Sequence, residues 1–203
     1  MQVLMSEITS DRARTAVSVL EAHGHEIVTC GDGTPRALPC AALRGESCAL
    51  STHSVDVALH VEGPEPPGLG DEGLLCAIRS FVPVVVATTE PGVPSEPFGP
   101  WAAAVCDLDD LDGALVAAVA APLGAHGVAA ARAANAVLAS AGMAPAWRAV
   151  VRRERRRLRV ELISDEPIDA DLCARSAVRA EGAIREIDGV TPTIDVEIAA
   201  PHQ

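Results

Sequence analysis

The feature that most constrains the fold is a regular alternation of strand-like and helix-like segments over residues 1–122. Residues 83–89 are almost all β-branched or small, as expected of a strand buried on both faces of a parallel sheet. Further strands are expected at residues 3–8, 25–30, 55–61 and 102–106. Strands that alternate with helices predict an α/β fold with a parallel, five-stranded, doubly wound sheet.

Three helices are expected between these strands. Ser10 and Asp11 cap the first, whose apolar residues recur at helical spacing as far as Leu20. The others span about 71–81 and 109–121. Residues 31–54, where another helix would stand, are rich in Gly, Pro, Cys and Ser and predict a long loop or a very short helix around residues 40–43.

The rest of the chain has a different order of elements. An Ala-rich helix is expected at 128–141, and a second helix at 169–187. Strands are expected at 147–151, 158–163 and 191–198, with an Arg-rich turn between the first two. The order is helix, strand, strand, helix, strand, which predicts a small α+β domain. We place the domain boundary between residues 122 and 123.

Charge is divided unevenly between these two parts. Residues 1–122 carry 5 Arg against 17 Asp and Glu, whereas residues 123–203 carry 11 of each. An acidic domain disfavours nucleic acid and anionic membrane as its partners. The N-terminus lacks the basic and apolar segments of a signal peptide, and the apolar run 114–123 is too short to span a membrane. The sequence thus predicts a cytoplasmic protein with no membrane partner.

Residues 1–122 resemble the receiver domain of response regulators, which has a flavodoxin-like fold. The resemblance rests on the alternation of strands and helices, on Pro83, which opens the fourth strand, and on Thr88, the hydroxyl residue at its end, as in receivers. Receivers carry an acidic pair after strand one, but here the residues are Ser6 and Glu7. The resemblance therefore implies a degenerate, or pseudo-receiver, domain.

Two other receiver residues are missing. The phosphoacceptor Asp expected at the end of the third strand is replaced by His60, Val61 and Glu62. The receiver Lys after the fifth strand cannot be present, because the sequence contains no Lys. Phosphoryl transfer needs a nucleophile and cations to neutralise developing charge, so this domain is expected to be incompetent for phosphorylation.

Four cysteines form a candidate metal site. Cys30 follows the second strand, Cys40 and Cys48 lie in the long loop, and Cys76 lies in the next helix. Four thiolates near the carboxyl end of a parallel sheet are suitable ligands for Zn²⁺ or an iron–sulfur cluster. The spacing matches no standard knuckle motif, so buried structural cysteines and a redox disulfide remain alternatives.

The second domain carries a candidate partner-binding hairpin. It contains the residues Arg152, Arg153, Arg155, Arg156 and Arg157. Guanidinium groups bind phosphate, so a protein partner and nucleic acid are both hypotheses beside a simple solvated turn. The order of elements, with Ile187–Val190 standing where a Gly-Val turn is expected, resembles BON-type or alkaline-shock-type modules, which implies binding or self-association.

These observations predict a non-catalytic regulatory protein of the bacterial signalling kind. It would act through protein–protein contacts or self-association. The alternatives are a cysteine-ligated Zn or Fe–S redox sensor and a nucleic-acid-associated regulator that uses the Arg-rich hairpin. An enzyme ranks last, because no nucleophile stands near an evident base in the sequence.

Overall fold

The computed structural model places the chain in two compact units, Met1–Ala120 (unit 1) and Ala121–Gln203 (unit 2). It describes residues 1–5, 8, 10–30, 45, 47–63, 72–89, 98–154, 157–188, 191 and 193–199. The division lies two residues before the boundary expected from the sequence.

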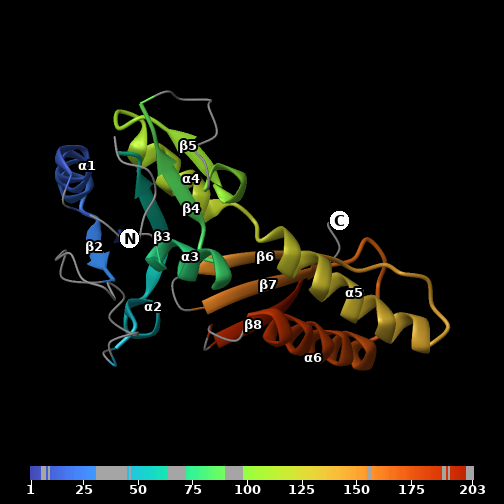
Figure 1. Ribbon diagram of the computed structural model, residues 1–203. Coiled ribbons are helices and arrows are strands. Elements are labelled where there is room, and N and C mark those ends of the chain that lie inside the picture. The colour runs from blue at the N-terminus through green and yellow to red at the C-terminus, as the bar shows by residue number, and fades with distance from the viewer. Residues whose placement is uncertain are drawn as a thin grey trace. The chain divides into compact units, whose positions relative to one another are not determined.

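Unit 1 contains a five-stranded parallel sheet (Figure 1). The strand order is β2-β1-β3-β4-β5, consistent with a flavodoxin-like fold. All four neighbouring pairs are parallel. The strands are β1 (Gln2–Met5), β2 (Glu26–Thr29), β3 (Val55–Val61), β4 (Val84–Ala87) and β5 (Ala104–Cys106).

Three of the four α-helices of unit 1 follow their strands in the order that the sequence predicts, whereas the short helix Ala49–Thr52 lies within residues 31–54, at a position where no helix was predicted. Ser10 caps α1 by accepting a hydrogen bond from the backbone N–H of Ala13 at 3.1 Å. A short 3₁₀ helix, η2 (Gly99–Trp101), precedes β5. The α-helices are α1 (Asp11–Ala22), α2 (Ala49–Thr52), α3 (Glu72–Arg79) and α4 (Leu111–Ala120).

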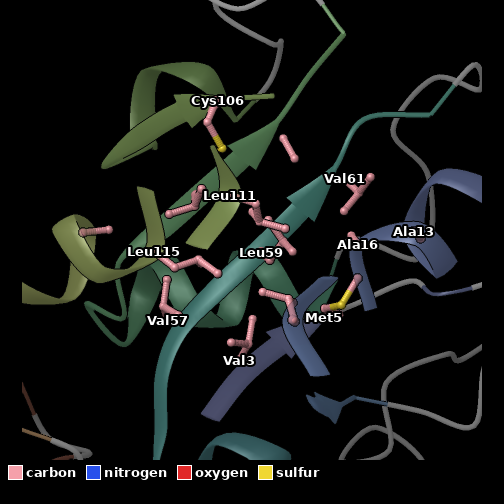
Figure 2. Close-up of a cluster of buried hydrophobic side chains, with 14 residues drawn as sticks. Val3, Met5, Ala13, Ala16, Val57, Leu59, Val61, Cys106, Leu111 and Leu115 are labelled. Carbon is pink, nitrogen blue, oxygen red and sulfur yellow. The ribbon is translucent and has the colours of Figure 1, made fainter. Parts of the chain in front are cut away.

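The sheet of unit 1 buries apolar side chains on both faces. Alternate residues of a strand point to opposite faces, so Val57 and Leu59 join one cluster and Ala58 joins another. Figure 2 shows the first cluster, in which β3 meets Leu111 and Leu115 of α4. The second cluster contains residues of α2 and α3. This burial on both faces explains the continuous apolar sequence of β4.

Unit 2 is a three-stranded sheet packed against two helices. Strand β6 pairs antiparallel with β7, and β7 pairs parallel with β8. Helices α5 and α6 pack against each other and share one apolar core with the sheet (Figure 1). The elements are α5 (Gly124–Ser140), β6 (Arg148–Glu154), β7 (Arg157–Ile163), α6 (Ala170–Ile187) and β8 (Thr193–Ala199).

Two boundaries in unit 2 differ from the sequence-based expectation. Helix α5 begins at Gly124, four residues earlier than expected, and includes Gly127. A Cβ at Gly127 would lie 2.9 Å from the carbonyl oxygen of Ala149, so this glycine permits the helix to approach β6 closely. Strand β6 continues to Glu154, so most of the predicted Arg-rich turn is strand.

One described helical stretch, Leu111–Ser140, is long and apolar enough to cross a membrane, by length and composition only. It consists of α4 and α5, which belong to different units and are separated by residues 121–123. Pro122 lies in that break. Because neither helix alone has that length, the stretch is weak evidence for a membrane span.

Candidate functional site

The carboxyl edge of the sheet in unit 1 is where a receiver would carry its active site. Glu62 follows β3, and its N–H donates to the carbonyl of Ala87 at 2.9 Å. Thr88 follows β4 and is 2% exposed, and its N–H donates to the carbonyl of Cys106 at 2.8 Å. Asp107 follows β5, while the structure after β1, at residues 6 and 7, lies outside the described residues.

After β5, where a receiver has a Lys, this chain has carboxylates. The Asp107 carboxylate accepts hydrogen bonds from the N–H groups of Asp109 and Asp110, both at 3.0 Å, and so fixes the turn before α4. Burial, followed by the charges of Asp107 and Asp110, raises the pKa of the Cys106 thiol. Arg12 opposes this shift but is the weakest of the four influences. The described residues that follow β3, β4 and β5 include no basic side chain that could neutralise a phosphoryl group as a receiver Lys does.

The raised pKa of Cys106 gives a testable expectation. Less of this thiol is ionised at pH 8 than in an ordinary cysteine, and the thiolate is the form that reacts with iodoacetamide. Cys106 is also 7% exposed, so we expect alkylation at least about tenfold slower in the folded than in the urea-unfolded protein. Peptide mapping by mass spectrometry measures both rates. Equal rates would contradict the burial and the pKa shift together.

The described candidate cysteine ligands lie at three different elements of unit 1. Cys30 follows the carboxyl end of β2, whereas Cys48 caps α2, which leads into the amino end of β3. Cys76 lies within α3. Among the described residues, no group of three Cys, His, Asp or Glu side chains is placed to hold a metal ion. Cys40 lies outside the described residues, so the four-cysteine Zn or Fe–S site stays a prediction.

Strand register divides the arginines of the predicted binding hairpin between two faces of the sheet. Arg153 lies opposite Leu158, and Val151 lies opposite Val160, so all four side chains belong to the helix-covered face. Arg152 lies opposite Arg159 on the other face. Arg153 is therefore 8% exposed and lies inside unit 2. Arg155 and Arg156 lie outside the described residues.

The arginines of the open sheet face are matched by carboxylates. Arg159 lies 2.8 Å from Glu197 and 3.7 Å from Glu161, which is also 3.4 Å from Arg152. Further pairs are Arg157–Asp195 at 3.1 Å, Arg148–Asp165 at 3.0 Å and Arg159–Glu154 at 4.0 Å. Exposed pairs of this kind contribute little stability. They do occupy the guanidinium groups that a phosphate backbone would need.

We therefore expect no measurable binding of nucleic acid to the open sheet face of unit 2 at physiological salt. Neutralised guanidinium groups release few counterions, and counterion release supplies most non-specific affinity. The measurement is fluorescence anisotropy of labelled duplex DNA and single-stranded RNA with the full chain. Binding that weakens steeply with salt and is lost in Arg152→Glu would contradict this expectation.

A second polar cluster lies buried inside unit 2. Asp188 follows α6, and its side chain is fully buried. Its Oδ2 atom lies 2.8 Å from Arg153 Nη2 and 3.4 Å from Nε2 of His126, which is 1% exposed. Thr191 donates to the same carboxylate through its N–H at 3.0 Å and its hydroxyl at 2.9 Å. Arg153 also donates to the Thr191 hydroxyl at 2.9 Å. We call His126, Arg153, Asp188 and Thr191 the buried ionic cluster.

The buried ionic cluster keeps Asp188 charged. Burial alone would raise the pKa of this carboxyl, but contacts with His126, Thr191 and Arg153 outweigh burial and hold the pKa well below its usual range. The cluster joins the start of α5, strand β6 and the end of α6. The sequence pattern did not indicate it, since 62 residues separate His126 from Asp188 and nothing in their spacing marks a pair.

Neither a comparison with protein-family models nor one with curated proteins finds a match to this chain. Arguments about its function therefore rest on its own sequence and geometry.

Proposed function

We propose that the chain is a non-catalytic regulatory protein, cytoplasmic in location, whose unit 1 is a receiver-like domain without phosphorylation chemistry. Unit 2 is proposed as a small binding module, and both units act through contacts with other protein. The strand order of unit 1 supports the receiver likeness.

The observation that carries this proposal is the chemistry of the carboxyl edge in unit 1. The residues after β3 and β5 are Glu62 and Asp107, where a receiver has its phosphoacceptor Asp and its Lys. Asp107 is engaged in the turn before α4 by two hydrogen bonds. Phosphoryl transfer depends on positive charge aimed at the transferred group, and the described residues after β3, β4 and β5 supply no basic side chain for that role.

Unit 2 supports a binding role by a separate argument. The arginines of its sheet pair with carboxylates of the same unit. On the open sheet face these pairs are exposed, and in the buried ionic cluster they join secondary-structure elements. Such arrangements set the shape of a module and leave its outer helix surfaces for recognition.

The test of the proposal is chemical phosphorylation. The full chain is incubated with acetyl phosphate and Mg²⁺, and its intact mass is recorded by mass spectrometry. We expect no phosphorylated species above the background found in a urea-unfolded sample. A stoichiometric phosphoryl adduct that fragmentation places on His60, Glu62 or Asp107 would overturn the proposal. The positive control is an active receiver from another source in the same tube. If that receiver is phosphorylated while this chain is not, the negative result is interpretable.

A further inference from the structure

The outer surface of α5 and α6 carries a groove with a volume of about 490 Å³. Six of its seven lining residues are exposed, and Val137 alone is buried. The groove is therefore a surface feature rather than an enclosed small-molecule pocket. The lining residues are Ala136, Val137, Ser140, Ala174, Arg175, Val178 and Arg179.

The floor of the groove consists of apolar side chains that are nevertheless highly exposed to solvent. Val178 is 68% exposed, the highest value among the exposed large hydrophobic residues of the described chain. Ala136 and Ala174 are small, so the helices leave a depression between them rather than a ridge. Apolar area that a monomer leaves exposed in this way is typical of a surface that binds a partner.

The arginines beside this groove differ from the other arginines of unit 2. The described arginines of the sheet, together with Arg185, all lie within 4.0 Å of a carboxylate. Arg179 lines the groove, and Arg132 lies one helical turn from Ala136 on the same face of α5. Both are exposed, and neither forms an ion pair with any part of the chain that the structure describes. Arg175 pairs only with the highly exposed Asp171, at 3.7 Å.

We propose that the α5–α6 groove docks an amphipathic helix with an acidic flank, contributed by a partner protein. Two packed helices offer a third helix a hydrophobic groove, which is a recurring mode of peptide recognition. Among the described residues, two arginines and no carboxylate line the groove, so charge complementarity selects an acidic partner. This inference rests on the proposed function, since it names the surface through which unit 2 makes protein contacts.

The probe is a fluorescent peptide designed as an amphipathic helix, with Leu at helical spacing and Glu on both flanks. Its controls are a scrambled sequence and a version with Lys in place of Glu. Val178→Glu places a charge on the apolar floor, and Val116→Glu is its control because Val116 is 53% exposed on α4 of unit 1. Arg179→Glu tests the charge requirement, with exposed Arg79→Glu as its control. Circular dichroism verifies that every variant is folded.

We expect the Glu peptide alone to bind, with an affinity that falls as salt rises. Val178→Glu should weaken binding by at least about tenfold, Arg179→Glu by roughly tenfold, and the two unit 1 controls by less than about twofold. Equal affinity for the Lys peptide, or binding that ignores both groove variants, would overturn the proposal. So would a wild-type dimer in sedimentation that Val178→Glu converts to monomer, because the occupant would then be a second copy. Phosphorylation by acetyl phosphate would overturn the proposed function of unit 1 and leave this binding result unchanged, so the two failures are distinguishable.

Discussion

Replacing Asp188 with Ala is expected to lower the free energy of unfolding of unit 2 by about 3–5 kcal/mol, because it leaves Arg153 buried without its partner. A loss of this size is a large share of the stability of a small domain. The measurement is urea unfolding followed by the fluorescence of Trp147, the buried tryptophan of unit 2. Trp101→Phe removes the other tryptophan, which lies in unit 1, from the signal.

A matched control separates the buried ionic cluster from surface ion pairs. Asp165→Ala breaks the pair with Arg148, but both side chains are largely exposed, so it should cost no more than about 1 kcal/mol. The double variant Asp188→Ala/Arg153→Met removes both charges and should recover part of the loss. Equal effects of Asp188→Ala and Asp165→Ala would contradict the energetic role of the cluster.

The low pKa of Asp188 also predicts how stability depends on pH. The pKa of the carboxyl is lower in the folded than in the unfolded state, so its contribution is fully present above the ordinary Asp value of about 4. It is lost as pH falls below that value, since the unfolded chain takes up the proton first. The folded wild type should therefore lose stability more steeply than Asp188→Asn between about pH 5 and pH 2. Parallel curves would show that Asp188 does not supply this dependence.

Replacing Trp147 with Ala is the second change expected to have a large effect, about 3–5 kcal/mol on unit 2. Trp147 is 4% exposed and belongs to the shared core of α5, α6 and the sheet. Its indole N–H donates to the buried Ser176 hydroxyl at 3.0 Å. Asn135 in addition accepts from the N–H of Trp147 at 2.9 Å and donates to its carbonyl at 2.9 Å.

One variant separates the packing of Trp147 from its hydrogen bonding, and a second variant serves as a surface control. Trp147→Phe keeps an aromatic ring but leaves the Ser176 hydroxyl without its donor, so it should cost about 1–2 kcal/mol. Trp101→Ala removes a tryptophan that is 66% exposed, and should change stability by no more than about 0.5 kcal/mol. Because Trp147 is the altered residue, unfolding is followed by circular dichroism. Equal losses for Trp147→Ala and Trp101→Ala would contradict the placement of Trp147.

The sequence predicted the elements with strong periodicity. The β3 strand was expected over the residues that form it, and the helices α1, α3, α4 and α6 lie within two residues of their expected bounds. These elements have regular apolar spacing and clear caps, so local sequence is enough to define them. The parallel five-stranded sheet was likewise expected from the alternation of elements, and unit 2 contains the three strands expected of a small α+β domain.

Features that depend on distant contacts were missed. Gly124 and Gly127 favour a linker locally, yet α5 includes both because Gly127 packs against Ala149 of β6. The Arg-rich run looked like a turn, since local sequence did not show that Arg153 meets Asp188 in the interior. The groove between α5 and α6 was not predicted either, because it depends on which faces of two helices pack together.

The most direct measurement of the central claim is fluorine NMR of the full chain with Mg²⁺ and beryllofluoride, which mimics a phosphoryl group on a carboxylate. Because no basic side chain follows Glu62 or Asp107 at the described carboxyl edge, we expect only the signals of free beryllofluoride and fluoride. Stoichiometric protein-bound signals that vanish in Glu62→Gln or Asp107→Asn would show that the edge holds a phosphoryl-like group, and would contradict the account of unit 1.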